Sequence, residues 1–217
     1  MTSDAGNGIG YTGIRVRGSD PTRVNVTING VPLNDTESQG VFWVNLPDFA
    51  SSTESMQIQR GVGTSTNGAG AFGASLNLLT NKLNKDFYVE LNNTIGSFNT
   101  LKNTVKVGTG LLNDKFSVDG RFSKITSDGY IDRGSSDLTS FYVSGAYYGK
   151  NQSLRLNIFS GHEVTYQSWY GIDGTTLEKD RTFNPAGTEK LDEPYENQVD
   201  DYTQTHYQLV YNNQFNN

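Results

Sequence analysis

Three glycines of one loop have the spacing of a dinucleotide-binding motif. Gly68, Gly70 and Gly73 read G-x-G-x-x-G, and in NAD- and FAD-binding proteins such glycines follow a strand and open the helix that holds the pyrophosphate. A strand is predicted just before them, at residues 54–60, but residues 74–80 are too few for the crossover helix. The sequence therefore predicts strand, glycine-rich loop and strand here, without a nucleotide cofactor.

Side chains that could do catalytic or metal chemistry are few and scattered. The chain has no cysteine, and His162 and His206 belong to no metal-binding spacing. Two groups of carboxylates in predicted loops lack the spacing of a calcium-binding loop: Asp35 with Glu37, and Asp192 with Glu193 and Glu196. They could bind a cation, but we interpret them first as solvated charges. We predict that the chain is not an enzyme and holds neither a metal ion nor a cofactor.

Three aromatic residues, Tyr166, Trp169 and Tyr170, lie together in or beside a long predicted loop. Aromatic rings can stack on a ligand. They also form the girdle where a membrane β-barrel meets the lipid headgroups. The sequence alone leaves both interpretations open.

Composition and charge narrow the class of protein. The net charge of −6 over 217 residues argues against non-specific binding of nucleic acid, which needs a basic face. The mean hydropathy is −0.56 and apolar runs are short, so no helix is expected to cross a membrane. Strands of a membrane β-barrel would leave only a weak hydropathy signal. The first residues have no signal-peptide pattern, and both ends look cut from a longer chain.

The second part of the chain alternates between apolar and polar side chains. In residues 87–95, Val89 and Leu91 lie on one face of the predicted strand, and Glu90 and Asn92 lie on the other. The same alternation predicts six strands: residues 87–95, 101–107, 115–125, 139–148, 153–164 and 202–215. Most are longer than the usual strand of a globular domain and match the length of membrane barrel strands.

Short and long links mostly alternate between these strands. The links near residues 112–114 and 149–152 are short, and those at 126–138 and 167–201 are long. The first link, 96–100, is short where a long one is expected. This alternation is typical of an up-and-down antiparallel barrel with short periplasmic turns and longer outer loops. A soluble β-sandwich is the alternative, since it also uses alternating strands and hairpins.

The first part of the chain has a different texture, with short strands separated by glycine-rich loops. Strands are predicted at residues 14–17, 24–28, 54–60 and 75–80. A short helix is expected to start around Leu46-Pro47-Asp48, because proline and aspartate favour the first turn of a helix.

Five ordered motifs in this first part resemble the plug domain of TonB-dependent outer-membrane receptors. They are GIRVRG at residues 13–18, TINGVPL at 27–33, LP at 46–47, ESMQIQRG at 54–61 and NGAGAFGASLN at 67–77. The last of these contains the three glycines of the apparent dinucleotide motif. Their order makes the resemblance specific, and it explains those glycines as turn and close-packing positions.

The resemblance implies a mostly β fold in two parts. Residues 1–82 would be the C-terminal part of a plug domain, a small mixed sheet with short helices. Residues 83–217 would be the first six or so antiparallel strands of an incomplete up-and-down transmembrane β-barrel, which in this family has about 22 strands.

The resemblance also implies active uptake of a scarce nutrient through the outer membrane of a Gram-negative bacterium. The expected partners are a TonB-type energy-coupling protein, which would contact a segment outside this sequence, outer-membrane lipid and a small nutrient ligand, with no nucleic acid. We expect an iron chelate of the siderophore type, because the elaborate segment 34–45 is similar to receptors for iron complexes. A soluble β-rich module that binds carbohydrate or protein is the alternative function.

Particular residues follow from the resemblance. Arg60 stands where plugs of the family use arginine to pair with barrel carboxylates, and Glu54 is expected in the same plug–barrel latch. The expected substrate-side residues are Arg17, Asp35, Glu37 and Trp43 of the plug, with Tyr166, Trp169 and Tyr170 beside the candidate outer gate, the loop 167–201. An anionic ferric chelate would favour arginine, whereas sugars or cobalamin would favour Trp and Tyr.

Overall fold

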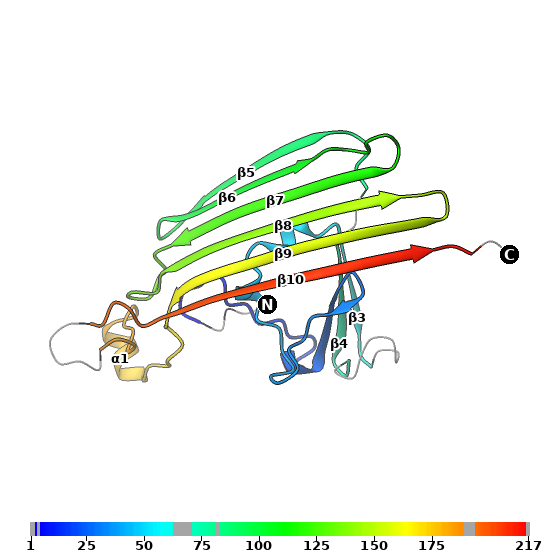
Figure 1. Cartoon of the computed structure of the whole chain (residues 1–217). Helices are drawn as coiled ribbons and strands as arrows, with labels where there is room; N and C mark the ends of the chain where they lie inside the picture. Colours follow the sequence, from blue (N-terminus) through cyan, green and yellow to red (C-terminus); the bar gives the residue numbers. More distant parts are fainter. Residues whose placement is uncertain (1–2, 4, 63–70, 81–82, 189–193, 216–217) are drawn as a thin grey trace.

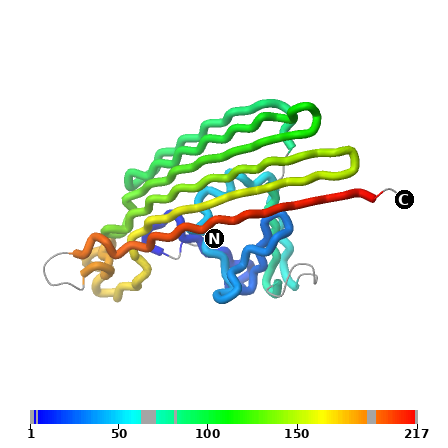
Figure 2. The backbone as a smooth tube through the Cα atoms, viewed as in Figure 1, coloured from blue at the N-terminus to red at the C-terminus, as the bar shows by residue number. Residues whose placement is uncertain are grey.

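The chain folds into two parts that lie against each other (Figures 1 and 2). The computed structural model describes residues 3, 5–62, 71–80, 83–188 and 194–215. We call the part that ends at residue 80 the N-terminal module and the sheet formed by the later strands the wall. The module contains a four-stranded mixed sheet, and the wall is a six-stranded antiparallel sheet that is not closed. The division between residues 82 and 83 stays a prediction, because residues 81–82 lie outside the described ones.

The sheet of the module has the strand order β2-β1-β4-β3. Its strands are β1 (Val24–Ile28), β2 (Val31–Pro32), β3 (Ser55–Arg60) and β4 (Ala74–Leu79). β1 and β4 are parallel, and the outer pairs are antiparallel. Asn29 and Gly30 both have positive φ, at 55° and 82°, which lets the chain reverse tightly between β1 and β2. The predicted strands 24–28, 54–60 and 75–80 are therefore confirmed.

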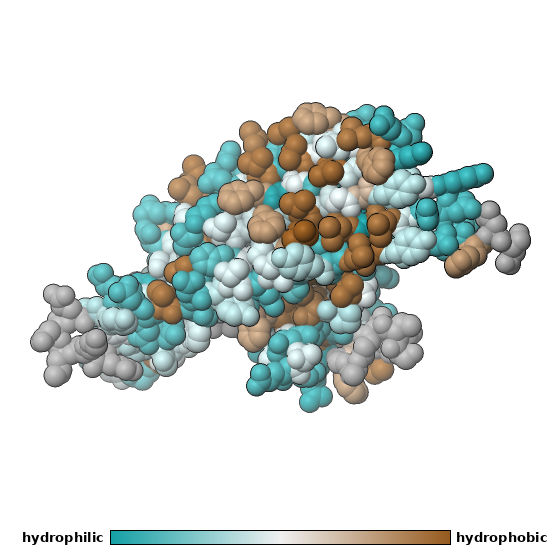
Figure 3. Space-filling view, viewed as in Figure 1, coloured by the Kyte–Doolittle hydropathy of each residue, from teal (hydrophilic) through white to brown (hydrophobic). Residues whose placement is uncertain are grey.

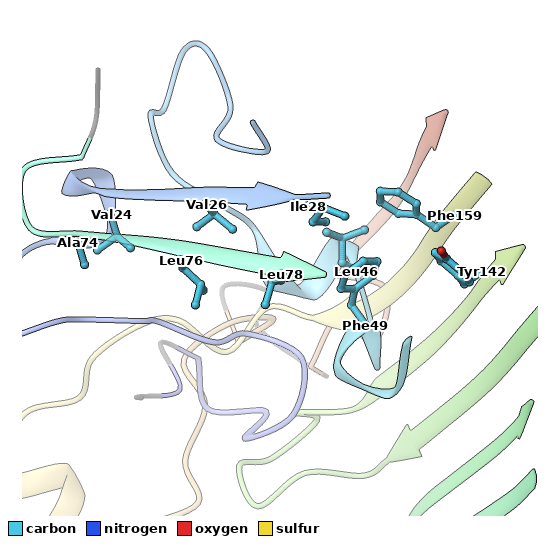
Figure 4. Close-up of a cluster of buried hydrophobic side chains, with 10 residues drawn as sticks. All are labelled: Val24, Val26, Ile28, Leu46, Phe49, Ala74, Leu76, Leu78, Tyr142 and Phe159. Carbon is cyan, nitrogen blue, oxygen red and sulfur yellow. The ribbon is translucent and has the colours of Figure 1, made fainter. Parts of the chain in front are cut away.

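The core of the module is completed by the wall. Ten buried residues form one cluster: Val24, Val26, Ile28, Leu46, Phe49, Ala74, Leu76, Leu78, Tyr142 and Phe159 (Figure 4). Tyr142 and Phe159 come from wall strands, and the rings of Phe49 and Phe159 lie 5.2 Å apart. The module by itself has little apolar area to bury, so its stability depends on contact with the wall.

Short 3-10 helices lie in the loops of the module. They are η1 (Pro21–Arg23), η2 (Trp43–Asn45) and η3 (Phe49–Ser52). The short helix expected to start around Leu46-Pro47-Asp48 is η3, which begins at Phe49 with Asp48 at its N-cap position. The strand predicted at 14–17 is wrong, because Arg17 and Gly18 adopt positive φ and Val16 forms an isolated bridge with Ser19 instead of a strand. A turn at Arg17-Gly18 interrupts the extended pattern that the alternation suggested.

The glycine-rich loop has the predicted context. β3 ends before it and β4 follows it, with no helix in the described residues between them. Gly68 and Gly70 lie outside the described residues. At Gly73, a Cβ atom would lie 2.6 Å from Ser19 Cβ and 3.1 Å from the Arg23 carbonyl oxygen, so this glycine permits close packing.

The wall is an antiparallel meander in which each strand pairs with its neighbours in sequence, in the order β10-β9-β8-β7-β6-β5. The strands are β5 (Tyr88–Gly96), β6 (Thr100–Gly108), β7 (Phe116–Ser127), β8 (Ser136–Tyr148), β9 (Gln152–Tyr166) and β10 (Val199–Asn213). All six predicted strands are confirmed. The alternation of apolar and polar side chains predicts these strands correctly because each strand has one face toward the module and one face away from it.

The face of the wall that points away from the module is apolar and exposed (Figure 3). Its large exposed side chains include Val89, Leu91, Ile95, Leu101, Val105, Val107, Phe116, Val118, Phe122, Phe141, Val143, Leu154, Leu156, Tyr207, Leu209 and Tyr211. The opposite, inner face has Ser117, Arg121, Ser123, Ser140, Ser144 and Asn157, all buried. This is the reverse of a globular protein, where the exposed face is polar.

The links of the wall fall into two sets. Residues 97–99, 128–135 and 167–198 connect the strands at one end, which we call the loop end, and residues 109–115 and 149–151 connect them at the other. The loop 167–198 contains the only α-helix among the described residues, α1 (Gly174–Lys179), whose first turn is capped by the side chain of Asp173. Within the described chain, no helix has the length and apolar character needed to cross a membrane.

Candidate functional site

A groove of about 1,020 Å³ opens between the N-terminal module and the loop end of β9 and β10. Module segments that include Tyr11 and Trp43 form one side of it, and Glu163, Asp200 and Tyr202 of the wall form the other. Among the residues predicted to face a substrate, four line this groove: Asp35, Glu37, Trp43 and Trp169. The fold thus brings together residues more than a hundred positions apart in sequence.

Tyr11 joins the two sides of the groove. Its hydroxyl lies 3.0 Å from Thr165 Oγ1 and donates to Asp200 Oδ2 at 3.2 Å. Its ring meets Trp169 edge-on, with 5.6 Å between the ring centres. Burial, with a smaller contribution from the charges of Glu163 and Asp200, raises the pKa of the Tyr11 phenol. Tyr11 therefore stays protonated and serves as a hydrogen-bond donor to the wall. The sequence alone does not indicate this role.

The other predicted substrate residues do not line the groove. Arg17 is exposed in the turn that replaces its predicted strand. Tyr166 is buried, its hydroxyl donates to the Tyr195 carbonyl oxygen, and the guanidinium of Arg133 lies 5.8 Å from its ring centre. Tyr170 is exposed beyond the groove. Contact of these three residues with a substrate stays a prediction, and in this structure Tyr166 holds the loop 167–198 together.

Asn7 ties the module to the loop end of the wall. Its side-chain amide donates to the carbonyl oxygens of Ser135 and Tyr166, both at 3.0 Å, and its own oxygen accepts from Ser168 Oγ at 2.6 Å. The side chain is buried, with 2% of the residue exposed. One asparagine thus connects the module to both long loops.

Replacing Asn7 by alanine is expected to loosen both loops. The buried Tyr166 carbonyl would lose a donor, whereas the Ser135 carbonyl keeps its hydrogen bond from the Tyr166 amide at 3.0 Å. A buried group that is left unsatisfied costs about 1–3 kcal/mol. In limited proteolysis of the full-length protein, cleavage within residues 167–198 should become roughly tenfold faster or more. The control is Asn92→Ala, because Asn92 is exposed on β5 and donates to Glu90. Equal cleavage of the two variants would contradict this role of Asn7.

A cluster of charges fastens the module to the middle of the wall. Asp48 of the module accepts hydrogen bonds from the Lys102 ammonium, from Thr104 Oγ1 at 2.8 Å and from Ser123 Oγ at 2.7 Å. Arg121 Nη1 lies 3.7 Å from Asp48 Oδ2. The side chains of Asp48 and Arg121 are both 3% exposed. This is a buried ion pair with added hydrogen bonds, the arrangement in which the loss of one partner costs most.

Residues next to Asp48 in the sequence also form hydrogen bonds with the inner face of the wall. Arg121 Nε donates to Ser52 Oγ at 2.6 Å, and Ser140 Oγ donates to the Pro47 carbonyl oxygen at 2.6 Å. Asp48 itself adopts a left-handed conformation, with φ of 54°, which aims its carboxylate at β6 and β7. The residues from η2 to η3 therefore dock on the wall as one unit.

The protonation of Asp48 follows from these contacts. Burial raises the pKa of its carboxyl group, but the hydrogen bonds from Lys102 and three hydroxyl groups outweigh burial and hold the pKa below its ordinary value. A carboxyl group whose pKa is lower in the folded state stabilises that state at pH values above its unfolded pKa of about 3.9. That stabilisation is lost as the pH falls through the lower folded value.

We therefore expect the docking of the module to weaken in acid. Protection of residues 43–53 against hydrogen exchange, corrected for the intrinsic pH dependence of exchange, should be constant from neutral pH to about pH 5 and should fall below about pH 4. The variant Asp48→Asn should lack this acid-dependent step. An identical pH profile for the two proteins would assign the step to another group.

A second polar contact lies near the turn between β1 and β2. Asn29 Nδ2 donates to Thr80 Oγ1 at 2.9 Å and to Gln208 Oε1 at 3.2 Å, and Gln208 Nε2 donates to the Ile28 carbonyl oxygen at 3.2 Å. Thr80 Oγ1 also lies 2.8 Å from the Tyr142 hydroxyl. The edge strand β10 is thus held to the module by side-chain amides.

The two residues predicted as a latch occupy different places. Glu54 lines a small cavity of about 230 Å³, in which three carboxylates and three cations share one space. The others are wall residues: Glu90, Asp119, Lys106, Arg121 and Arg155. Arg60 is exposed at the end of β3. A latch role for Glu54 and Arg60 stays a prediction, whereas Asp48 makes the contact described above.

The sequence did hold a signal for the Asp48 cluster. Lys102 and Arg121 stand on the polar faces of predicted strands, and cations that point into an enclosed space need a counter-charge. The sequence could not show that Asp48 is the counter-charge, because Asp48 meets Lys102 and Arg121 only when the module docks on the wall. Among the described residues, no group of three or more His, Asp or Glu side chains could hold a metal ion.

Comparison with known proteins identifies the module. The family described as TonB-dependent Receptor Plug Domain matches residues 1–75. The N-terminal module is a TonB-dependent receptor plug. It lies on the inner face of an open antiparallel sheet, as expected for a plug followed by barrel strands. No curated protein sequence matches the chain.

Solved structures place the plug and the wall in one fold. The ferripyoverdine receptor FpvA of Pseudomonas aeruginosa matches with a TM-score of 0.73 and 14% identity, over 94% of this chain and 27% of its own. The ferric-catecholate import receptor Fiu of Escherichia coli matches with a TM-score of 0.69 and 19% identity, over 94% of this chain and 31% of its own. The siderophore receptor PirA of Acinetobacter baumannii matches with a TM-score of 0.57 and 20% identity, over 77% of this chain and 28% of its own. At these identities the likeness establishes the fold. The chain spans between a quarter and a third of these three structures.

Proposed function

We propose that the chain is the plug and the first barrel strands of a TonB-dependent outer-membrane receptor for active uptake of a scarce nutrient. The observation that carries the proposal is the docking of a family-matched plug on the polar face of a sheet whose other face is apolar and exposed. A plug needs a polar lumen, and a barrel needs an apolar exterior.

The apolar outer face supports an outer-membrane location. Exposed side chains such as Leu91, Val105 and Val143 repeat along the face pointing away from the plug. A continuous apolar surface of this extent is rare on a protein surrounded by water, but it is required of a strand that faces lipid. It therefore weighs against the alternative of a soluble carbohydrate- or protein-binding module.

The contacts between plug and wall are of a kind that allows the plug to move. Apart from the small apolar cluster, they are hydrogen bonds and ion pairs, as at Asp48 and Asn29. Water can replace such bonds when the plug shifts, so the net free energy of separation is smaller than the number of bonds suggests. A TonB-type partner would supply the energy for that step, through a segment outside this sequence.

For the nutrient, we propose an iron chelate of the siderophore type. Support comes from the structures with the same fold, since FpvA was solved with an iron-loaded pyoverdine and Fiu is described as a ferric-catecholate importer. The groove between the plug and the loop end is the place where we expect the chelate to bind.

A deletion strain tests this function. The gene would be removed and growth measured on single iron sources, each a different ferric chelate, with the intact gene restored on a plasmid as control. We expect growth to fail on one or a few chelates and to return with the plasmid. Growth should also fail when the TonB-type protein is removed instead. Unchanged growth on every iron source, with loss of growth on cobalamin or a glycan, would overturn the iron assignment.

A further inference from the structure

The charges that line the groove all have the same sign. Two carboxylates, Asp35 and Glu37, come from the plug, and two, Glu163 and Asp200, come from the wall. No lysine, arginine or histidine is among the described residues that line it. A cleft lined by charges of one sign concentrates ions of the opposite sign.

These carboxylates are not neutralised by neighbouring cations. None of the four takes part in an ion pair within 4.0 Å in the described part of the chain. Asp35 accepts hydrogen bonds from the backbone amides of Glu37 and Ser38 at 3.0 and 2.7 Å. Asp200 accepts a hydrogen bond from the Tyr11 hydroxyl, and Glu163 accepts one from Thr165 Oγ1, so the side-chain donors to these two carboxylates are neutral hydroxyl groups.

Aromatic rings share the same groove. Tyr11, Phe42, Trp43, Trp169 and Tyr202 line it beside the carboxylates. Phe42 and Trp169 are about half exposed, at 55% and 48%, so their rings are open to a ligand. The faces of aromatic rings attract cations, and carboxylates next to them strengthen that preference. An anion entering this space would meet negative charge from both sides and no basic side chain to bind it.

We propose that the groove takes a ligand that carries a net positive charge, with an ammonium or guanidinium group between the carboxylates and the aromatic rings. This inference rests on the proposed function and narrows it. The imported chelate would be cationic, and an anionic chelate would be excluded. Arg17, the only cation among the residues predicted to face a substrate, does not line the groove.

The sign of the potential in the groove can be measured without knowing the ligand. Ser38 lines the groove and is exposed, and the chain has no cysteine. In the full-length receptor, with any other cysteine replaced, Ser38→Cys would react with a cationic trimethylammonium-ethyl or an anionic sulfonatoethyl methanethiosulfonate. The reference is Ser97→Cys, an exposed serine beside β5 at the far edge of the wall. It corrects for the intrinsic reactivity of the two reagents.

We expect the ratio of cationic to anionic labelling rates to be roughly tenfold or more higher at residue 38 than at residue 97. The pair of substitutions Asp35→Asn and Glu37→Gln changes only exposed side chains and should lower that ratio at least threefold. Glu163→Gln with Asp200→Asn should lower it as well. A ratio equal to the reference, or one favouring the anion, would overturn the inference.

A charge series of one chelate tests the ligand itself. A linear ferric trihydroxamate with a free terminal ammonium group has one positive charge, its N-acetyl form is neutral, and its N-succinyl form is negative. Binding to the full-length receptor should be tightest for the first and at least tenfold weaker for the last. Equal affinity of all three would overturn the inference. If none of the three binds while labelling at residue 38 still favours the cation, the inference about charge stands, and the growth test on single iron sources decides the iron assignment separately.

Discussion

Replacing Asp48 by asparagine is expected to detach the plug from the wall locally. The substitution keeps the shape of the side chain but removes the charge opposite Arg121, which is 3% exposed and would remain buried without its counter-ion. Removing one partner of a buried ion pair costs about 3–5 kcal/mol. We expect the lower end of that range, because Arg121 keeps its hydrogen bonds to Ser123 and Ser140. In hydrogen exchange of the full-length receptor, residues 43–53 should exchange about a hundredfold faster.

The matched control is Asp20→Asn. Asp20 is also an aspartate of the plug, but it is exposed and only caps η1 through Thr22. Asparagine caps a helix about as well as aspartate, so this variant should leave the stability nearly unchanged. If Asp48→Asn exchanged no faster than Asp20→Asn, the carboxylate would not be what fastens the plug.

A single methyl group on the wall should have a comparable effect. At Gly161 of β9, a Cβ atom would lie 2.2 Å from the Asn45 carbonyl oxygen and 2.5 Å from Pro47 Cδ. Both are atoms of the backbone or of a rigid ring, so neither can rotate away. Gly161→Ala should therefore push the segment from η2 to η3 off the wall, at a cost of about 1–3 kcal/mol or more. Exchange of residues 43–53 measures the displacement.

Gly145→Ala is the control for this substitution. Gly145 lies in the adjacent strand β8, and a Cβ atom there would meet nothing within 4 Å. Alanine suits a strand slightly better than glycine does, so the wall should fold at least as well in both variants. Faster exchange in both variants would show that the effect comes from the strands rather than from the plug contact.

The wall could be predicted from the sequence because one simple rule governs it. Val89 and Leu91 alternate with Glu90 and Asn92, and the structure places the first pair on the exposed apolar face. The strands of such a wall differ on their two faces along their whole length, which gives a clean period of two. The plug offered no such rule. The extended pattern at residues 14–17 ends in a turn at Arg17, and tertiary packing decided that outcome.

The candidate site could be predicted only in part. Asp35, Glu37, Trp43 and Trp169 were expected to face a ligand, and the fold places them in one groove. The negative charge of the groove could not be predicted from Asp35 and Glu37 alone. Glu163 and Asp200 add to it, and these two residues reach the groove through the pairing of β9 with β10. The Asp48 cluster was hidden for the same reason. A residue pattern shows which side chains point inward, but it does not show which inward side chains from distant segments meet.

The most direct measurement tethers the plug to the wall and asks whether uptake stops. The Lys102 ammonium lies 3.5 Å from Ser51 Oγ, so cysteines at residues 51 and 102 would be separated by about the length of a lysine side chain. A short reagent with two thiol-reactive groups can span that gap in the full-length receptor. We expect the untreated double variant to import its ligand, and the cross-linked one to bind ligand but import none. Each single-cysteine variant should be unaffected by the reagent. Undiminished uptake after complete cross-linking would contradict the proposal that this plug must leave the wall.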